Sequence, residues 1–309
     1  MNAPFPQFIL KFEYVGYLEI RNLQSIVLLP EAISGCWNLQ ALIFIDCSGF
    51  VTLPESIGKL KKLRTLELRK IKDLESLPLS LGDCRDLQYL KLYSCWRLRK
   101  IPISLDRNGS LKLLQIVNCR DLKLLPSEFV EFSNLQTFSL ASCSSFQDLP
   151  ATLSCPMLRT LDLSWTNVTM LPQWATTIGT LECINLYGCK ELVELPKGIG
   201  KLKSLAVLNV DGCTKLSCMP SDIGQLIRLT QLGLFVIGCG GDDARIFVLE
   251  NLNSLSGDLR ITNLMYLKDP CDAEKACLKR KNGIQNLVFD WSPIDTFFFF
   301  FFFLRKVSY

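Results

Sequence analysis

The chain has 309 residues, of which 49% are hydrophobic, and its formal net charge of +4 comes from 34 basic and 30 acidic side chains. This small, mixed charge gives no electrostatic basis for binding nucleic acid or an anionic membrane, and no apolar run approaches the ~20 residues that a membrane-spanning helix needs. The sequence contains no histidine, which excludes Ser-His and Cys-His nucleophile pairs and the usual general base at neutral pH.

Residues 1–14 precede any repeated pattern and are predicted to form a partial N-terminal cap. Their sequence, which begins MNAPFPQFILKF, lacks the basic region and the continuous apolar region of a secretory leader. The 14 cysteines therefore do not indicate a secreted disulfide framework. We expect reduced thiols and a soluble, cytoplasmic protein.

Residues 15–237 repeat one pattern every 23 or 24 residues. We number each unit from its leading apolar residue; these residues are Val15, Leu39, Leu63, Leu87, Leu111, Leu135, Leu158, Leu181, Leu205 and Leu229. Positions 4 and 6 are apolar, as in Leu66 and Leu68, which indicates a short strand with one buried face and with positions 3, 5 and 7 toward solvent. Because one unit cannot bury its own apolar edge, the repeat predicts an α/β solenoid: an arc with a concave parallel β-sheet of about twelve short strands.

A proline ends the L-x-x-L-P-like segment of each unit from the first to the ninth. Proline fixes φ and lacks a backbone donor, so it ends the strand ladder and directs the chain to the convex face. That face is predicted to be irregular or short-helical. Each return is expected to carry an apolar residue inward; examples are Ile57, Leu81, Phe129, Ile199 and Ile223.

The last part of the chain departs from the regular spacing. Residues 238–255, which include the glycine-rich GCGGDD, are predicted to form an irregular insertion. Residues 256–296 restore the strand alternation twice and are predicted to form two further irregular repeats. Residues 297–309, FFFFFFFLRKVSY, fit no repeat position, and we expect this tail to lie outside the fold.

The pattern L-x-x-L-x-L-x-x-C-x-x-L-x-x-L-P is a leucine-rich repeat, and it resembles the recognition domain of plant intracellular immune receptors. The segments FVIG (235–238), LENLNSLSGDLRITNL (249–264), DAEKACLKRK (272–281) and LVFDW (287–291) occur in an order similar to that of coiled-coil-type nucleotide-binding leucine-rich-repeat resistance proteins. Such receptors carry a nucleotide-binding module ahead of the repeats. No G-x-x-x-x-G-K-[ST] motif occurs here, which suggests a fragment without that module.

Catalysis has no supporting constellation in the sequence. Carboxylate pairs such as Glu191 and Glu194 fall on turn and return segments, where a solvated face is the simpler interpretation. Gly58 and Gly200 each precede a lysine, but leucines replace the first glycine and the Ser or Thr of a phosphate-binding loop. We therefore expect no enzyme activity and no cofactor.

Position 9 is cysteine in six units, at Cys47, Cys95, Cys119, Cys143, Cys189 and Cys213. Stacked sulfurs could form a metal ladder or disulfides. However, there is no C-x-x-C pair and no histidine ligand in the sequence. We favour free thiols that act as small buried hydrophobes and weak donors toward turn carbonyls, with no metal site.

Candidate partner contacts are aromatic and charged residues at positions 3, 5, 7 and 8. The aromatic candidates are Tyr89, Tyr93, Trp165, Tyr187 and Phe235. Isolated aromatics also occur on sheets without a function, but on a rigid concave sheet they supply large contact area at small entropic cost. Tyr187 and Phe235 are expected to flank Asp211 on the exposed face, with neither in the core. By the resemblance, Arg69 and Lys91 are candidates for docking a nucleotide-binding module in cis.

The interpretation is a protein-recognition module without catalysis. The resemblance implies plant defence: sensing a pathogen effector or a guarded host protein, and autoinhibition of the receptor in its absence. The alternative is a Ras-type leucine-rich-repeat signalling scaffold, in which LPxxIGxL units are also common; the FVIG and DAEKACLKRK segments argue against it. No nucleic acid or membrane partner is expected.

Overall fold

The computed structural model describes residues 13–24, 29–107, 109–127, 129, 131–238, 240, 244–267 and 269–292. The expected cap at 1–14 lies mostly outside these residues, and the tail at 297–309 lies wholly outside them. The fold separates into two compact units, Met1–Leu161 and Asp162–Tyr309. Each unit is described by itself, and β7 (Thr160–Asp162) spans the boundary.

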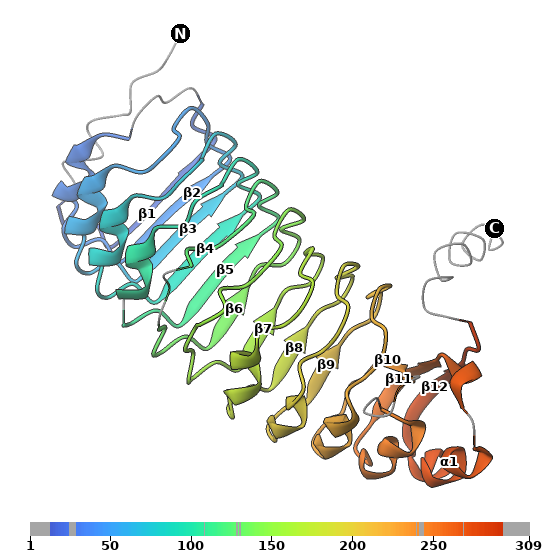
Figure 1. Cartoon of the computed structure of the whole chain (residues 1–309). Coiled ribbons are helices and arrows are strands. Elements are labelled where there is room, and N and C mark those ends of the chain that lie inside the picture. Colours follow the sequence, from blue (N-terminus) through green and yellow to red (C-terminus); the bar gives the residue numbers. More distant parts are fainter. Residues whose placement is uncertain are drawn as a thin grey trace. The chain divides into compact units, whose positions relative to one another are not determined.

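Unit 1 is a parallel sheet whose strands follow one another in chain order (Figure 1). Its strands are β1 (Tyr17–Arg21), β2 (Ala41–Ile45), β3 (Thr65–Arg69), β4 (Tyr89–Tyr93), β5 (Leu113–Val117) and β6 (Thr137–Ser139). Neighbouring strands pair residues exactly one repeat apart, for example Leu66 with Leu90. Leu66 and Leu68 are fully buried, which confirms that positions 4 and 6 form the core.

The returns of unit 1 contain short 3-10 helices. They are η2 (Glu31–Gly35), η3 (Glu55–Lys59), η4 (Leu79–Asp83) and η5 (Ile103–Arg107). Pro54 precedes η3 with φ −68° and an extended ψ, and its carbonyl accepts a hydrogen bond from the Ile57 amide at 3.1 Å. Proline therefore both ends the strand segment and starts the helical turn that carries Ile57 into the core, where it is 1% exposed. The short-helical returns expected from the sequence are confirmed.

Unit 2 contains β8 (Cys183–Asn185) and β9 (Val207–Asn209), which pair in parallel, and a separate parallel sheet. That second sheet is β10 (Leu234–Val236), β11 (Ser256–Thr262) and β12 (Gly283–Phe289). Its short helices are η6 (Gln173–Thr177), η7 (Ile199–Lys201), η8 (Ser221–Gln225), η9 (Ile246–Asn251), η10 (Leu264–Tyr266), α1 (Pro270–Lys275) and η11 (Leu278–Arg280). The described chain thus contains twelve short parallel strands, as the repeat predicts. Within the described residues, no helix has the length and apolar character needed to cross a membrane.

One backbone feature recurs at position 8, in the turn that follows the strand, in the first nine repeats. Non-glycine residues with positive φ occupy it, including Asp46 (φ 52°), Asn118 (φ 56°) and Trp165 (φ 59°), and later units have glycine there, as at Gly188 (φ 71°). Asn, Asp and Gly tolerate this left-handed conformation, whereas a bulky side chain is strained in it. Lys70 (φ 54°), Ser94 (φ 55°) and Ser142 (φ 60°) adopt it as well, and Trp165 is the aromatic member of the column.

Candidate functional site

On unit 1, three of the candidate residues gather around one carboxylate, that of Glu67. Arg69 pairs with Glu67 through Nε, and the Lys91 amine lies 4.0 Å from Oε2 of the same side chain. The Arg69 guanidinium also lies 5.0 Å from the centroid of the Tyr93 ring, and the Tyr93 hydroxyl donates to Oε1 of Gln115 at 2.7 Å. The arrangement presents two cations and an aromatic ring in fixed positions, which suits contact with an acidic or polar partner surface.

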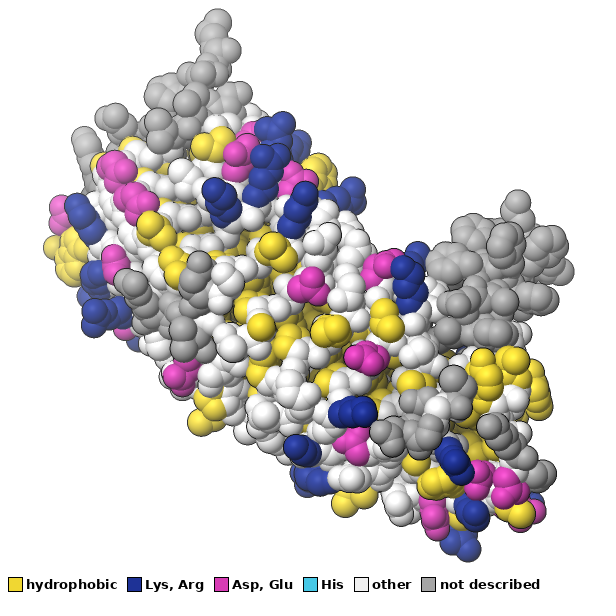
Figure 2. All heavy atoms as spheres, in the orientation of Figure 1, with side chains coloured by type: hydrophobic (Ala, Val, Ile, Leu, Met, Phe, Trp, Pro, Cys, Tyr) yellow, Lys and Arg dark blue, Asp and Glu magenta, His cyan; other side chains and the backbone are white. Residues whose placement is uncertain are grey.

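Glu67 corrects one expectation from the sequence. Position 5 is expected to face solvent, yet Glu67 is only 6% exposed, because cationic neighbours at positions 5 and 7 cover it. Figure 2 shows acidic and basic side chains gathered over the first strands of unit 1. The signal was present in the sequence as Glu67 with Arg69 two residues later and Lys91 one repeat later. Tyr89, the remaining candidate on unit 1, is 37% exposed at the start of β4.

On unit 2, Trp165 and Tyr187 form an exposed aromatic pair. Their ring centroids are 5.3 Å apart and their planes are inclined by 74°, and the two side chains are 47% and 40% exposed. The Trp165 amide donates to the Tyr187 carbonyl at 2.8 Å, so a backbone hydrogen bond between two adjacent repeats holds the pair together. The indole also covers Gly188, where an added Cβ would lie 2.8 Å from the Trp165 ring. Glycine at position 188 therefore makes room for the exposed tryptophan.

A side-chain turn orients the position-7 residues of unit 2. The Tyr187 amide donates to Oδ1 of Asn185 at 3.1 Å, and the Asp211 amide donates to Oδ1 of Asn209 at the same distance. Such Asx contacts compete with strand pairing, which explains why β8 and β9 end at these asparagines after three residues. The recurrent Asn at position 5 was a usable signal that the sequence reasoning missed.

The expectation for Phe235 is wrong. It is expected on the exposed face beside Asp211, but it is fully buried in β10 and pairs with Ile261, a core residue of β11. Leu234 and Val236 are buried as well, so burial does not alternate along β10, and it is the pairing with Ile261 that places the Phe235 ring in the core. Asp211 therefore has no aromatic neighbour at Phe235.

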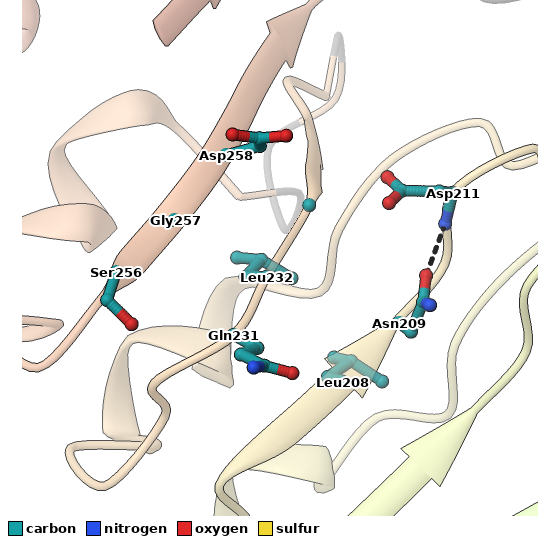
Figure 3. Close-up of a pocket in the computed structure, with 9 residues that line it drawn as sticks. Leu208, Asn209, Asp211, Gln231, Leu232, Ser256, Gly257 and Asp258 are labelled. Carbon is teal, nitrogen blue, oxygen red and sulfur yellow. Dashed lines mark hydrogen bonds between the residues drawn. The ribbon is translucent and has the colours of Figure 1, made fainter. Parts of the chain in front are cut away.

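A hollow of about 310 Å³ lies where β9 gives way to the second sheet of unit 2 (Figure 3). It is lined by Leu208, Asn209, Asp211, Gln231, Leu232, Gly233, Ser256, Gly257 and Asp258. Burial raises the pKa of Asp211, the nearby Asp258 also raises it, and Arg260 acts in the opposite direction. The repeat pattern indicates Asp211 but not Asp258, because an insertion of irregular length precedes β11 and its register cannot be read from the 24-residue spacing.

The sulfurs of the position-9 column are buried. Cys143 donates to the Ile116 carbonyl at 3.2 Å, and Cys213 donates to the Leu186 carbonyl at 3.1 Å. Burial raises the pKa of the Cys213 thiol, which keeps it protonated and unreactive. The described cysteines are free, and the described residues contain no group of three or more side chains placed to hold a metal ion. These thiols act as weak donors that satisfy carbonyls of the preceding unit.

Comparisons with known proteins agree with this fold. A family model described as a leucine-rich repeat region matches residues 120–290, more than half of the chain. A search of curated proteins finds no match. Among solved structures, a leucine-rich-repeat protein of Leptospira interrogans is 20% identical with a TM-score of 0.57, over 93% of this chain and 82% of the other.

Two further structures are similar over part of their own length. The Toll–Spatzle complex of Drosophila is 17% identical with a TM-score of 0.56, over 92% of this chain and 42% of the other. The functional domain of InlJ from Listeria monocytogenes, which includes a cysteine ladder, is 16% identical with a TM-score of 0.53, over 91% of this chain and 54% of the other. At these identities the likeness concerns the fold alone.

Proposed function

Because this chain belongs to the leucine-rich repeat region family, we propose that it is the protein-recognition module of an intracellular plant immune receptor. Leucine-rich repeats are protein-interaction modules, since stacked units present an extended, rigid surface. The finer assignment to plant defence is supported by the C-x-x-L-x-x-L-P repeat and by the order of the FVIG, DAEKACLKRK and LVFDW segments.

The exposed pair of Trp165 and Tyr187 carries the recognition part of the proposal. Trp165 is held at positive φ and is half-exposed, so neither backbone preference nor core packing accounts for an indole at this position. Tyr and Trp are enriched among the residues that dominate binding energy at protein interfaces. A strained, exposed aromatic residue fixed against a second ring is therefore better explained by contact with a partner.

The charged cluster of unit 1 is proposed as a second contact. Arg69 and Lys91 face solvent around Glu67 and are available to an acidic surface, such as that of a nucleotide-binding module in the same receptor. We propose no catalytic role for either unit: the chain has no histidine, and the two contact regions hold binding groups without a nucleophile and base pair.

Two experiments test this function. Sequencing the transcript upstream of the Met1 codon is expected to find an in-frame nucleotide-binding module with G-x-x-x-x-G-K-[ST]. A transcript that encodes the repeats without such a module would contradict the receptor assignment and favour the Ras-type scaffold. Pull-down from pathogen-challenged plant extract is expected to capture a partner with the wild-type chain. The Trp165→Ala, Tyr187→Ala double variant is expected to lose that partner.

The matched control is Tyr266→Ala, because Tyr266 is an exposed aromatic residue (37%) away from the pair, on η10. Truncating a central aromatic contact costs on the order of 2 kcal/mol or more, which is about a thirtyfold loss of affinity. Equal capture by the double variant and the control would contradict the placement of the contact surface.

A further inference from the structure

The hollow of unit 2 has a chemistry that the aromatic pair does not explain. We propose that it binds an arginine side chain of the protein partner, between the carboxylates of Asp211 and Asp258. This inference rests on the proposed recognition function and adds the chemical group that the partner must present.

Asp211 is placed in an unusual way. Its carboxylate lies directly over Gly233: a Cβ added at that glycine would come within 2.2 Å of Oδ2 and 2.6 Å of Oδ1. The carboxylate thus occupies the space that a side chain at position 233, in the next repeat, would otherwise fill. Within the described part of the chain, no group donates a hydrogen bond to it, and burial raises its pKa more than Arg260 lowers it. A partly desolvated carboxylate without a donor is stabilised by an incoming cation.

Asp258 provides the second carboxylate, from β11 on the other side of the hollow (Figure 3). Its Oδ1 accepts a hydrogen bond from the Asn286 amide at 2.7 Å, which fixes the side chain and leaves Oδ2 for a ligand. The side chains of Gln231 and Ser256 also line the hollow and add neutral acceptors. The lining therefore offers acceptors from several directions around one space.

This set of acceptors favours a guanidinium over an ammonium group. A guanidinium has five N–H donors in a planar fork and stays charged, and it pairs with carboxylates through two parallel hydrogen bonds. A lysine amine is a compact, strongly hydrated charge that can face only part of such a lining. Arginine therefore satisfies more of the acceptors than lysine does.

The size of the hollow is sufficient for a single side chain. At about 310 Å³ it lies at the lower end of the ~300–1,000 Å³ range of small-molecule pockets. Its place on the sheet also suits a protein ligand, because the Gly188 amide donates to the Asp211 carbonyl at 2.7 Å. The repeat that carries Tyr187 therefore lies directly beside the repeat that carries Asp211. One partner loop can contact the ring and insert its arginine next to it.

The experiment uses the full chain and the tripeptide Ac-Gly-Arg-Gly-NH2 as the probe, observed by saturation-transfer NMR across a titration. The matched probe replaces arginine with citrulline, which keeps the shape and removes the charge. We expect saturable binding of the arginine probe and at least about a tenfold weaker response to citrulline, because each charge-assisted hydrogen bond contributes about tenfold or more. The lysine tripeptide is expected to bind more weakly than arginine and more tightly than citrulline.

The variants keep the shape of the site. Asp211→Asn and Asp258→Asn are each expected to weaken arginine binding by at least about tenfold. The control Asp86→Asn makes the same charge change at an exposed residue of unit 1 and is expected to leave binding unchanged. Gly233→Ala tests the geometry without changing charge, since its Cβ must displace the Asp211 carboxylate, and it is also expected to weaken binding.

The outcomes separate this inference from the function on which it rests. Equal binding of arginine and citrulline, no saturable arginine binding, or wild-type binding by both Asn variants would each overturn the arginine site. If the arginine site is overturned in this way but the Trp165→Ala, Tyr187→Ala double variant still loses the partner, the proposed recognition function stands. Specific arginine binding together with undiminished partner capture by the aromatic double variant would instead contradict the recognition surface and leave the arginine site standing.

Discussion

The ring of Trp165 meets the ring of Tyr187 edge to face, with centroids 5.3 Å apart, although the two backbones differ in kind. Trp165 has a positive φ of 59°, whereas the φ of Tyr187 is negative. Two exposed aromatic residues in contact therefore respond differently to the same substitutions. That difference provides a direct test of strain at Trp165.

We expect Trp165→Gly and Trp165→Asn to be more stable than Trp165→Ala by about 1 kcal/mol, because Gly and Asn tolerate the left-handed region and Ala does not. All three variants lose the same indole contacts, so the comparison isolates the backbone. Urea denaturation gives the three free energies of unfolding.

The control is the same exchange at Tyr187, where Gly should be less stable than Ala by about 0.5–1 kcal/mol. The same order of stability at both positions would mean that Trp165 is not strained, and would remove one support of the recognition proposal.

We expect Phe235→Ala to lower the free energy of unfolding by about 3–5 kcal/mol, because the ring is fully buried in β10 and its removal leaves a cavity. Tyr187→Ala, at the same position of an earlier unit but 40% exposed, should cost much less. Chemical denaturation of both variants checks the comparison. A near-neutral Phe235→Ala would mean that the ring lies on the exposed face, as the repeat frame predicts.

The case of Phe235 shows which parts of the fold could be predicted from the sequence. Positions 4 and 6 are buried from the second to the tenth repeat, since each apolar side chain packs on its equivalent in the next repeat, and this constraint is written in the spacing. The burial of Phe235 depends instead on pairing with β11, which follows an insertion of irregular length. Extrapolation of the 24-residue frame fails where a strand pairs with a partner outside that frame.

The candidate contacts divide in the same way. Trp165, Tyr187 and Asp211 were predictable because they occupy outward positions of regular units. The contacts of Glu67 with Arg69 and Lys91 are indicated by the spacing in the sequence, but the burial of Glu67 is not. Asp258 was not predictable, because it reaches the hollow through the pairing of separate elements. Periodicity predicts which way a side chain points. It does not predict how neighbouring charges rearrange around it.

We expect Glu67→Gln to lower the free energy of unfolding by about 1–3 kcal/mol, because the change removes the negative charge and one of the two acceptor oxygens of a nearly buried, charge-assisted contact and leaves Arg69 and Lys91 to repel each other. A double-mutant cycle should give a larger coupling of Glu67 with Arg69, which contacts it directly, than with Lys91 at 4.0 Å. Denaturation at low and high salt measures the coupling energy of Glu67 with Arg69 and that of Glu67 with Lys91. Coupling energies that do not fall in high salt would contradict an electrostatic origin.

We expect Asp211→Asn to be more stable than the wild type at pH 7. Burial raises the pKa of Asp211 above its ordinary value of 3.8 in the folded protein, so the folded state holds the proton more tightly than the unfolded chain does. Stability from this group is therefore complete below pH 3.8 and is lost as the pH rises through the folded pKa. At pH 7 the wild type carries the full cost of a partly desolvated carboxylate, which the amide avoids.

Thermal unfolding of both proteins at pH 7 and pH 3 should show a higher Tm for the variant at pH 7 and a smaller difference at pH 3. The exposed control Asp86→Asn should change little at either pH. A wild type that is the more stable of the two at pH 7 would show that Asp211 is already compensated within the chain, and the hollow would then have no unsatisfied charge to offer a partner.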